Sequence, residues 1–192
     1  MEHRTCYLSA LLLFALLLTG CLPRYSIGTA AGSSSYISED RRTSGMFIED
    51  ESIELKSSRR LYQQFSNVAH VNITSFNRIV LLTGEAPSEN AKAEIEKLIM
   101  GVDNVRKIHN EITVASNSSL ASRSNDTLIT SKVKARFLAE RKFQINHVKI
   151  VTENGVVYLL GMVTHQEADD ASKIASSTAG VRKVVRVFEY LN

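Results

Sequence analysis

Two stretches of this 192-residue chain repeat each other, and the repeat limits the folds that the chain can adopt. Three short motifs recur. His-Val-x-Ile occurs at residues 70–73 and 147–150, and an apolar run that ends in glycine occurs at 79–84 and 156–161. Gly-Val occurs at 101–102 and 180–181. The spacing between the copies grows from 77 to 79 residues, which predicts a short insertion in the second copy around Thr164 to Gln166. The chain is therefore expected to contain two copies of one small domain.

Each copy has the pattern of an α-β-β-α-β unit. The expected helices cover residues 50–65 and 88–100 in the first copy and 126–141 and 166–178 in the second. Asn125 and Asp126 are residue types that favour a helix N-cap. Asn154-Gly155, between two β-branched runs, predicts a two-residue hairpin because both positions tolerate positive φ. Units of about 70 residues have small cores, so we expect the two units to pack on each other.

A short apolar leader precedes the repeats. Arg4 and the apolar run 8–18 have the pattern of a secretory signal, and the run is shorter than the roughly 20 residues that span a bilayer. Leu18-Thr19-Gly20-Cys21 resembles the bacterial lipobox, which implies that Cys21 is acylated and becomes the first mature residue. The alternative is an ordinary secretory signal with a chance cysteine. Because Cys6 lies in the leader, no disulfide is expected in the mature chain.

The expected organisation follows from composition and from the repeat. It comprises a signal peptide at 1–20, a flexible tether at 21–45, a first domain at 46–115, a linker at 116–124 and a second domain at 125–192. Residues 45–115 carry 8 basic and 10 acidic side chains, whereas residues 122–192 carry 11 basic and 7 acidic ones. This asymmetry indicates that the second unit meets an anionic surface, and for a lipid-tethered protein the nearest one is the bilayer.

The motifs resemble those of the BON domain family. Two units behind a lipobox, each with an apolar strand that ends in glycine and a Gly-Val motif after the second helix, are similar to outer-membrane lipoproteins with two BON domains. The most specific stretch is 124–133, Ser-Asn-Asp-Thr-Leu-Ile-Thr-Ser-Lys-Val, although the family often has Trp where this chain has Leu128. The resemblance implies an α+β fold of two tandem BON domains, each with two helices on a three-stranded mixed sheet.

The resemblance also implies a function. It implies a non-enzymatic lipoprotein, without a cofactor beyond the acyl chains on Cys21, that faces the periplasm from the outer membrane and maintains envelope integrity at the division site. Leu22 after the cysteine resembles the outer-membrane sorting pattern. The implied partners are anionic phospholipid and either the outer-membrane β-barrel assembly machinery or proteins that activate peptidoglycan amidases.

The expected helix 126–141 carries two apolar stripes. At about 100° per residue, Ile129, Val133 and Phe137 form a core stripe. A second, weaker stripe is bordered by basic residues, which suits insertion among anionic lipid headgroups. Its members are the candidate phospholipid-binding residues, and the resemblance implies that lipid binds through this helix: Leu128, Lys132, Lys134, Ala135, Arg136, Leu138 and Ala139.

Two other interpretations of the second stripe stay open. It can dock a partner protein, in which case the chain is an adaptor in the periplasm, or it can be a solvated or domain-packing face. Enzymatic activity is not expected, because the chain has no Gly-x-Ser-x-Gly nucleophile motif and no phosphate-binding glycine loop. None of the histidines is expected to bind a metal. The basic second unit lacks an aromatic stacking surface, so nucleic acid is not an expected partner.

Overall fold

The computed structural model describes residues 40–66, 68–116 and 118–191, which belong to one compact unit. The expected signal peptide, the lipidation residue Cys21 and most of the expected tether lie outside the described residues. The first repeat forms α3 (Ser44–Phe65), β1 (His70–Phe76), β2 (Ile79–Ala86), α4 (Glu89–Met100) and β3 (Lys107–Val114). The second forms α5 (Leu120–Glu140), η2 (Ile145–His147), β4 (Val148–Glu153), β5 (Val156–Val163), α6 (His165–Ser176) and β6 (Lys183–Tyr190).

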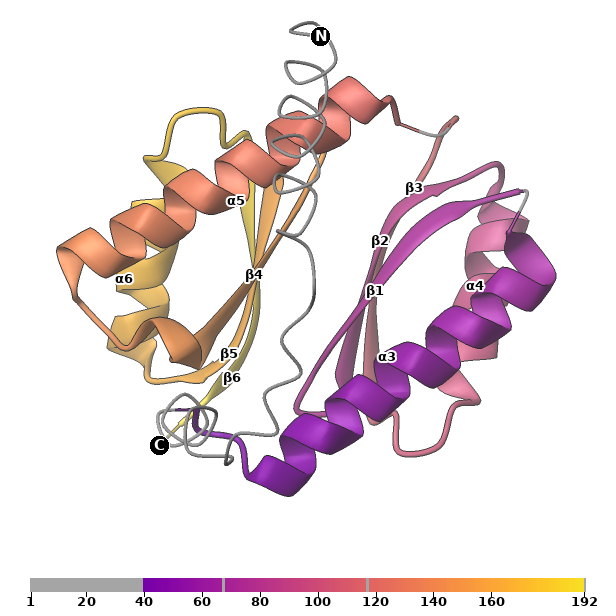
Figure 1. Cartoon of the computed structure of the whole chain (residues 1–192), viewed down its shortest axis with the longest axis horizontal. Coiled ribbons are helices and arrows are strands. Elements are labelled where there is room, and N and C mark those ends of the chain that lie inside the picture. Colours follow the sequence, from indigo (N-terminus) through magenta and orange to yellow (C-terminus); the bar gives the residue numbers. More distant parts are fainter. Residues whose placement is uncertain (1–39, 67, 117, 192) are drawn as a thin grey trace, which may run out of the picture. The chain divides into compact units, whose positions relative to one another are not determined.

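Each repeat folds as the predicted α-β-β-α-β unit. Its three strands form one mixed sheet, in the orders β1-β2-β3 and β4-β5-β6, with an antiparallel first pair and a parallel second pair. Figure 1 shows that the two helices of each repeat cover one face of its sheet. The α+β fold with two helices on each three-stranded sheet is therefore confirmed.

The central strands β2 and β5 are buried on both faces. Because side chains alternate along a strand, Val157 and Leu159 pack under helices α5 and α6, whereas Tyr158 and Leu160 point to the opposite face. There they form a second core with side chains of the first sheet, including Leu81. The two sheets thus pack face to face, which confirms the expected packing between the units and explains why both central strands are almost continuously apolar.

Helix α5 begins earlier than the sequence predicts. Its N-cap is Ser119, whose hydroxyl accepts a hydrogen bond from the N–H of Ser122. The helix therefore occupies residues 120–124, which the sequence analysis assigned to the linker. Asn125 and Asp126 lie inside the helix, so their expected role as N-caps is wrong.

Asp126 is instead a buried clamp on the β4–β5 hairpin. Its carboxylate accepts hydrogen bonds from the backbone N–H groups of Asn154 and Gly155, both at 2.8 Å. Asp50 does the same in the first repeat, where it accepts from the N–H groups of Asn77 and Arg78 at 2.8 Å. All four turn residues have positive φ, as the hairpin prediction requires. The clamp therefore fixes each hairpin to the first helix of its own unit.

The repeats align differently after the central strand than the sequence indicated. Asn104 and Gly180 have positive φ at equivalent places, two residues after a turn that closes each second helix. Gly180 thus corresponds to Asn104 at a spacing of 76 residues, and Gly101 corresponds to Ser177, the C-cap of α6. The predicted insertion around Thr164 is wrong, because the second copy has one residue fewer, not more, between the glycine of its central strand and the N-cap of α6.

The glycines that end the apolar runs permit a close approach of two backbones. A Cβ atom on Gly161 would lie 2.2 Å from the carbonyl oxygen of His147, and one on Gly84 would lie 2.1 Å from that of His70. No side chain fits at such distances. The repeated glycine is therefore a packing requirement of the first strand pair in each unit.

Replacing Gly161 by alanine is expected to lower the free energy of unfolding by about 2–3 kcal/mol, since the backbone of β4 must move to relieve the clash. Urea unfolding followed by circular dichroism measures the change. Gly45→Ala is the control, because a Cβ there meets only Thr43 Oγ1, at 4.0 Å, and favours helix α3. Equal stability of the two variants would contradict this explanation.

Candidate functional site: the outer face of helix α5

Helix α5 has one side firmly fixed in the core of the second unit. Ile129, Val133 and Phe137 are almost fully buried, as the predicted core stripe requires. The Asp126 clamp lies on the same side of the helix. Helix α5 therefore cannot rotate about its axis without breaking both contacts, and the orientation of its other side is set by the fold.

The opposite side of α5 is exposed and carries most of the candidate residues. Leu128 and Leu138 expose 59% and 58% of their surface. Lys132, Ala135 and Ala139 are exposed as well. Together with Leu128 these three lie within an arc of about 60° on the helix surface, and we call this group of four the outer stripe.

Arg136, one of the candidate phospholipid-binding residues, is bonded to other side chains and to the backbone of the protein. Its Nη1 donates to the carbonyl oxygen of Ile174 at 2.9 Å and to the hydroxyls of Ser177 and Thr178. Its Nη2 donates to Glu140 at 2.7 Å. A cation on the last carbonyls of a helix satisfies groups that lack partners and interacts favourably with the helix dipole. Arg136 therefore joins the end of α6 to α5, and its assignment as a phospholipid ligand stays a prediction.

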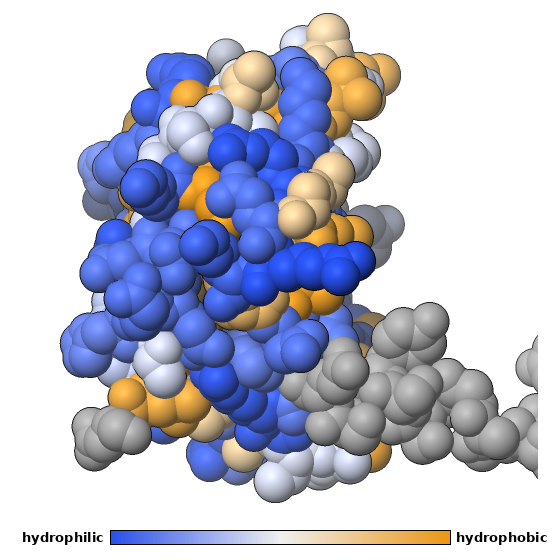
Figure 2. Space-filling view, turned by 90° about the vertical axis from the view of Figure 1, so that its left-hand side faces the viewer, coloured by the Kyte–Doolittle hydropathy of each residue, from blue (hydrophilic) through white to orange (hydrophobic). Residues whose placement is uncertain are grey.

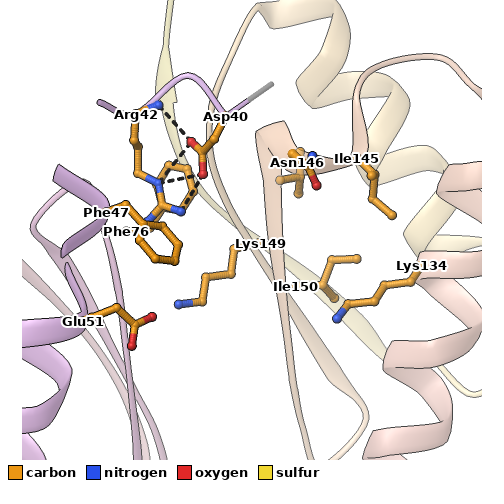
Figure 3. A pocket seen from close by; sticks show the side chains of 11 residues that line it. Asp40, Arg42, Phe47, Glu51, Phe76, Lys134, Ile145, Asn146, Lys149 and Ile150 are labelled. Atoms are coloured by element: carbon orange, nitrogen blue, oxygen red, sulfur yellow. Dashed lines mark hydrogen bonds and ion pairs between the residues drawn. The ribbon is translucent and has the colours of Figure 1, made fainter. Parts of the chain in front are cut away.

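Lys134 points away from the outer stripe. It lies about 120° around the helix from Leu128 and lines a groove of about 540 Å³ between α5, β4 and the start of α3. Figure 3 shows Lys134 and Ile150 on one side of that groove, across from Phe76 and Glu51. The structure thus separates Lys134 from the other candidates.

A second hollow lies at the C-terminal end of α5 and adds residues that the sequence analysis missed. Leu138 lines it together with Phe143 and the basic residues Arg141 and Lys142. Neither Arg141 nor Lys142 makes a side-chain hydrogen bond or ion pair with the described residues. Two adjacent basic residues that begin three positions after the last exposed leucine of α5 were the available sequence signal. Arg141 and Lys142 thus add to the positive charge of Lys132, and the attraction of this end of α5 to an anionic surface is stronger than Lys132 alone provides.

Figure 2 shows the side of the described chain that carries α5 and α6. Hydrophilic side chains cover most of this face, and the hydrophobic ones form separate small patches. A surface of this kind does not drive deep burial in hydrocarbon. It suits a shallow contact in which exposed leucines enter an interface and basic residues supply the remaining attraction.

Metal-ligating side chains do not gather among the described residues, and burial shifts the pKa of two titratable groups. No cluster of three or more His, Cys, Asp or Glu side chains among residues 40–66, 68–116 and 118–191 can hold a metal ion. Burial, with help from Lys107, lowers the pKa of His109 below its usual value. Burial between the sheets raises the pKa of Tyr158 to about 12. No helix in this part of the chain has the length and apolarity to cross a bilayer.

The start of the described chain is fixed to the second unit by an ion pair. Arg41 donates to both carboxylate oxygens of Glu167, at 2.7 and 2.9 Å, and to the carbonyl oxygen of Met162. Burial raises the pKa of Glu167, but the bonds from Arg41 and from the N–H of Thr164 outweigh it and lower the pKa to about 2. Residues 40–43, which the sequence assigned to the tether, are therefore part of the folded unit.

Comparison of the sequence with known proteins identifies the family of the chain. The family model described as BON domain matches residues 49–116 and 125–192. The chain is 36% identical over 187 residues to Outer membrane lipoprotein DolP of Haemophilus influenzae, a match that covers 96% of each chain. It is 33% identical to the 21 kDa hemolysin of Actinobacillus pleuropneumoniae, over 79% of each chain. It is 31% identical to Osmotically-inducible protein Y of Escherichia coli, over 73% of this chain and 72% of that one.

Proposed function

The chain belongs to the BON domain family, and we propose that it is an outer-membrane lipoprotein that binds anionic phospholipid through helix α5. The name of the Haemophilus influenzae relative, an outer membrane lipoprotein, supports the location, because the match runs along 96% of both chains. The lipobox at residues 18–21 supports the mode of attachment. Several acyl chains on one cysteine anchor a protein stably, since each buried methylene contributes about 0.8 kcal/mol.

The observation that carries the lipid-binding proposal is the outer stripe of α5. Leu128 is largely exposed on a helix whose opposite side is locked into the core. Lys132 flanks it, and Arg141 and Lys142 follow at the end of the helix. A basic residue near an anionic bilayer contributes about 1 kcal/mol. Since the lipid anchor already holds the chain close to the membrane, this modest attraction is sufficient to orient the second unit.

The first helix of the first unit also exposes apolar side chains, but its charge differs from that of α5. Helix α3 carries Glu49 and Glu51 near its start, and Glu51 is exposed. Negative charge at this position repels an anionic bilayer. We therefore assign lipid binding to the second unit alone. Maintenance of envelope integrity at the division site, through the β-barrel assembly machinery or amidase activation, is part of the same proposal and follows from the family resemblance.

Acylated Cys21 is expected to be the first residue of the mature chain. Mass spectrometry of the N-terminal peptide, from protein purified out of the outer-membrane fraction, should show loss of residues 1–20 and the added mass of acyl chains. Cys21→Ser should leave the signal uncleaved or the protein free of the outer membrane. An unmodified N-terminus, or cleavage at another position, would refute the lipoprotein assignment.

The rival interpretation, an adaptor that docks a protein on the same stripe, differs in its response to salt. Attraction between basic side chains and an anionic bilayer is screened over about 8–10 Å at 0.10–0.15 M salt. An apolar protein dock is insensitive to such screening. Binding to anionic vesicles at low and high salt therefore separates the two.

A further inference from the structure

Strand β4 is an edge strand of the second sheet. It pairs with β5 on one side, and no strand among the described residues pairs with its other side. The two-residue turn Asn154-Gly155 makes Glu153 and Val156 a hydrogen-bonded pair. By alternation, the N–H and C=O groups of Ile150 and Thr152 point away from β5 toward the open edge. No hydrogen bond within the described residues reaches these outward backbone groups.

The corresponding position of the first sheet is closed. Ser75 on β1 is equivalent to Thr152, and its N–H donates to Glu54 Oε1 at 2.7 Å. The carbonyl oxygen of Ser75 accepts from Lys149 Nζ at 3.3 Å. Protein side chains therefore satisfy this part of the β1 edge. Natural proteins block sheet edges in such ways to prevent unwanted pairing. Within the described residues, the edge of β4 is not blocked in this way, so it can pair with another strand.

A groove lies beside the first half of β4, where Val148, Lys149 and Ile150 line it. It has a volume of about 540 Å³, within the range of about 300–1,000 Å³ of ligand-binding pockets. Phe47 and Phe76 line one wall, and Ile145 and Ile150 line the other. Figure 3 shows the neighbours Lys149 and Ile150 pointing to opposite sides of β4, so the groove faces the edge of the strand and not one face of the sheet.

The charges along the groove are paired except at two places. Arg42 bonds to Asp40 and Asp50, and Lys149 bonds to Glu54. Glu51 and Lys134, on opposite walls, form no ion pair with the described residues. A ligand that extends along β4 thus meets apolar side chains on both walls and one unpaired cation on the α5 side. That cation complements an acidic side chain.

We propose that the open edge of β4 binds an extended peptide segment of a partner protein, which adds to the β4-β5-β6 sheet as a fourth strand. Backbone hydrogen bonds to Ile150 and Thr152 supply the affinity, and alternate side chains supply the specificity, as in other cases of strand addition. The preferred segment carries an apolar side chain against Ile145 and Ile150 and, two residues away, an acidic side chain opposite Lys134.

The test uses the full chain in detergent and a capped synthetic peptide, Ser-Val-Ile-Val-Glu-Val-Ser. Amide NMR should show shifts centred on Ile150 and Thr152, and hydrogen exchange of the Ile150 N–H should slow with saturating peptide. The same peptide methylated on alternate backbone nitrogens keeps its side chains but cannot add as a strand, so it should not bind. Lys134→Glu should weaken binding about fivefold through loss of one ion pair.

Lys132→Glu is the matched control, because Lys132 lies on the outer stripe outside the groove. It should leave peptide affinity within about twofold while it lowers binding to anionic vesicles. Absence of shifts at 1 mM peptide, or equal binding of the methylated peptide, would overturn the proposal. So would an Ile150 N–H that is already protected without peptide and becomes exposed when residues 22–39 are deleted, because the chain's own N-terminal segment would then occupy the edge.

Discussion

Replacing Asp126 by alanine is expected to lower the free energy of unfolding by about 3–5 kcal/mol. The substitution leaves the N–H groups of Asn154 and Gly155 without an acceptor at a site where Gly155 is buried. A buried donor without a partner costs about 1–3 kcal/mol, and more when the lost acceptor is charged. Asp126→Asn keeps one acceptor oxygen and should lose about half as much.

Urea unfolding of residues 22–192, followed by circular dichroism, measures this change. The control is Asp169→Ala, which removes an exposed carboxylate that pairs with Arg186 at the surface. Exposed ion pairs contribute less than about 1 kcal/mol. If Asp126→Ala unfolds at the same urea concentration as Asp169→Ala, Asp126 does not clamp the hairpin.

Much of the fold was predictable because the repeat shows it twice. The strand pair around Asn154-Gly155 has two independent signals, the turn type and the apolar runs on both sides, and both agree with the structure. Packing between the units was also predictable, since a unit of about 70 residues has a small core of its own. Signals that depend on alternation and turn chemistry are local, and the sequence displays them directly.

The role of Asp126 was not predictable from local signals. Aspartate before an apolar helical run is typical of an N-cap, and only the fold brings the hairpin N–H groups, 28 and 29 residues away, to its carboxylate. The cap was Ser119, seven residues earlier. The register of Gly180 was misassigned for a similar reason. A Gly-Val pair recurs by chance, whereas the positive φ shared with Asn104 appears only in the backbone.

The candidate site was predicted in part. Helical spacing placed Leu128, Ala135 and Ala139 on the exposed side, as the structure shows. Helical spacing gives the side of the helix from which a side chain starts, but not the position of the charged group at the end of a long side chain. Arg136 leans from the edge of the stripe to the end of α6, and Lys134 reaches into the groove. Basic residues that border a stripe on a helical wheel therefore need tertiary contacts before they can be assigned to a ligand.

Replacing Leu128 by glutamate is expected to reduce binding to anionic vesicles by up to about a hundredfold. A charge at membrane depth costs on the order of 2–3 kcal/mol, which corresponds to that factor. The fold should persist, because Leu128 is exposed and lies about 100° around α5 from Ile129, the nearest residue of the core stripe. Circular dichroism and the urea midpoint should match those of the unsubstituted chain.

Leu55→Glu is the matched control. Leu55 exposes 53% of its surface on helix α3 of the first unit, close to the 59% of Leu128. It should leave vesicle binding within about twofold, since one exposed leucine outside the binding surface contributes little to membrane affinity. The pair therefore separates a specific effect of α5 from a general loss of surface hydrophobicity or a gain of negative charge.

Co-sedimentation of residues 22–192 with phosphatidylglycerol vesicles, for the unsubstituted chain and for Leu128→Glu and Leu55→Glu, tests most directly whether α5 is the lipid-binding surface. We expect the unsubstituted chain and Leu55→Glu to sediment with the vesicles at low salt, and folded Leu128→Glu to stay in the supernatant. Normal sedimentation of a folded Leu128→Glu chain would contradict this expectation and favour a protein partner for the outer stripe.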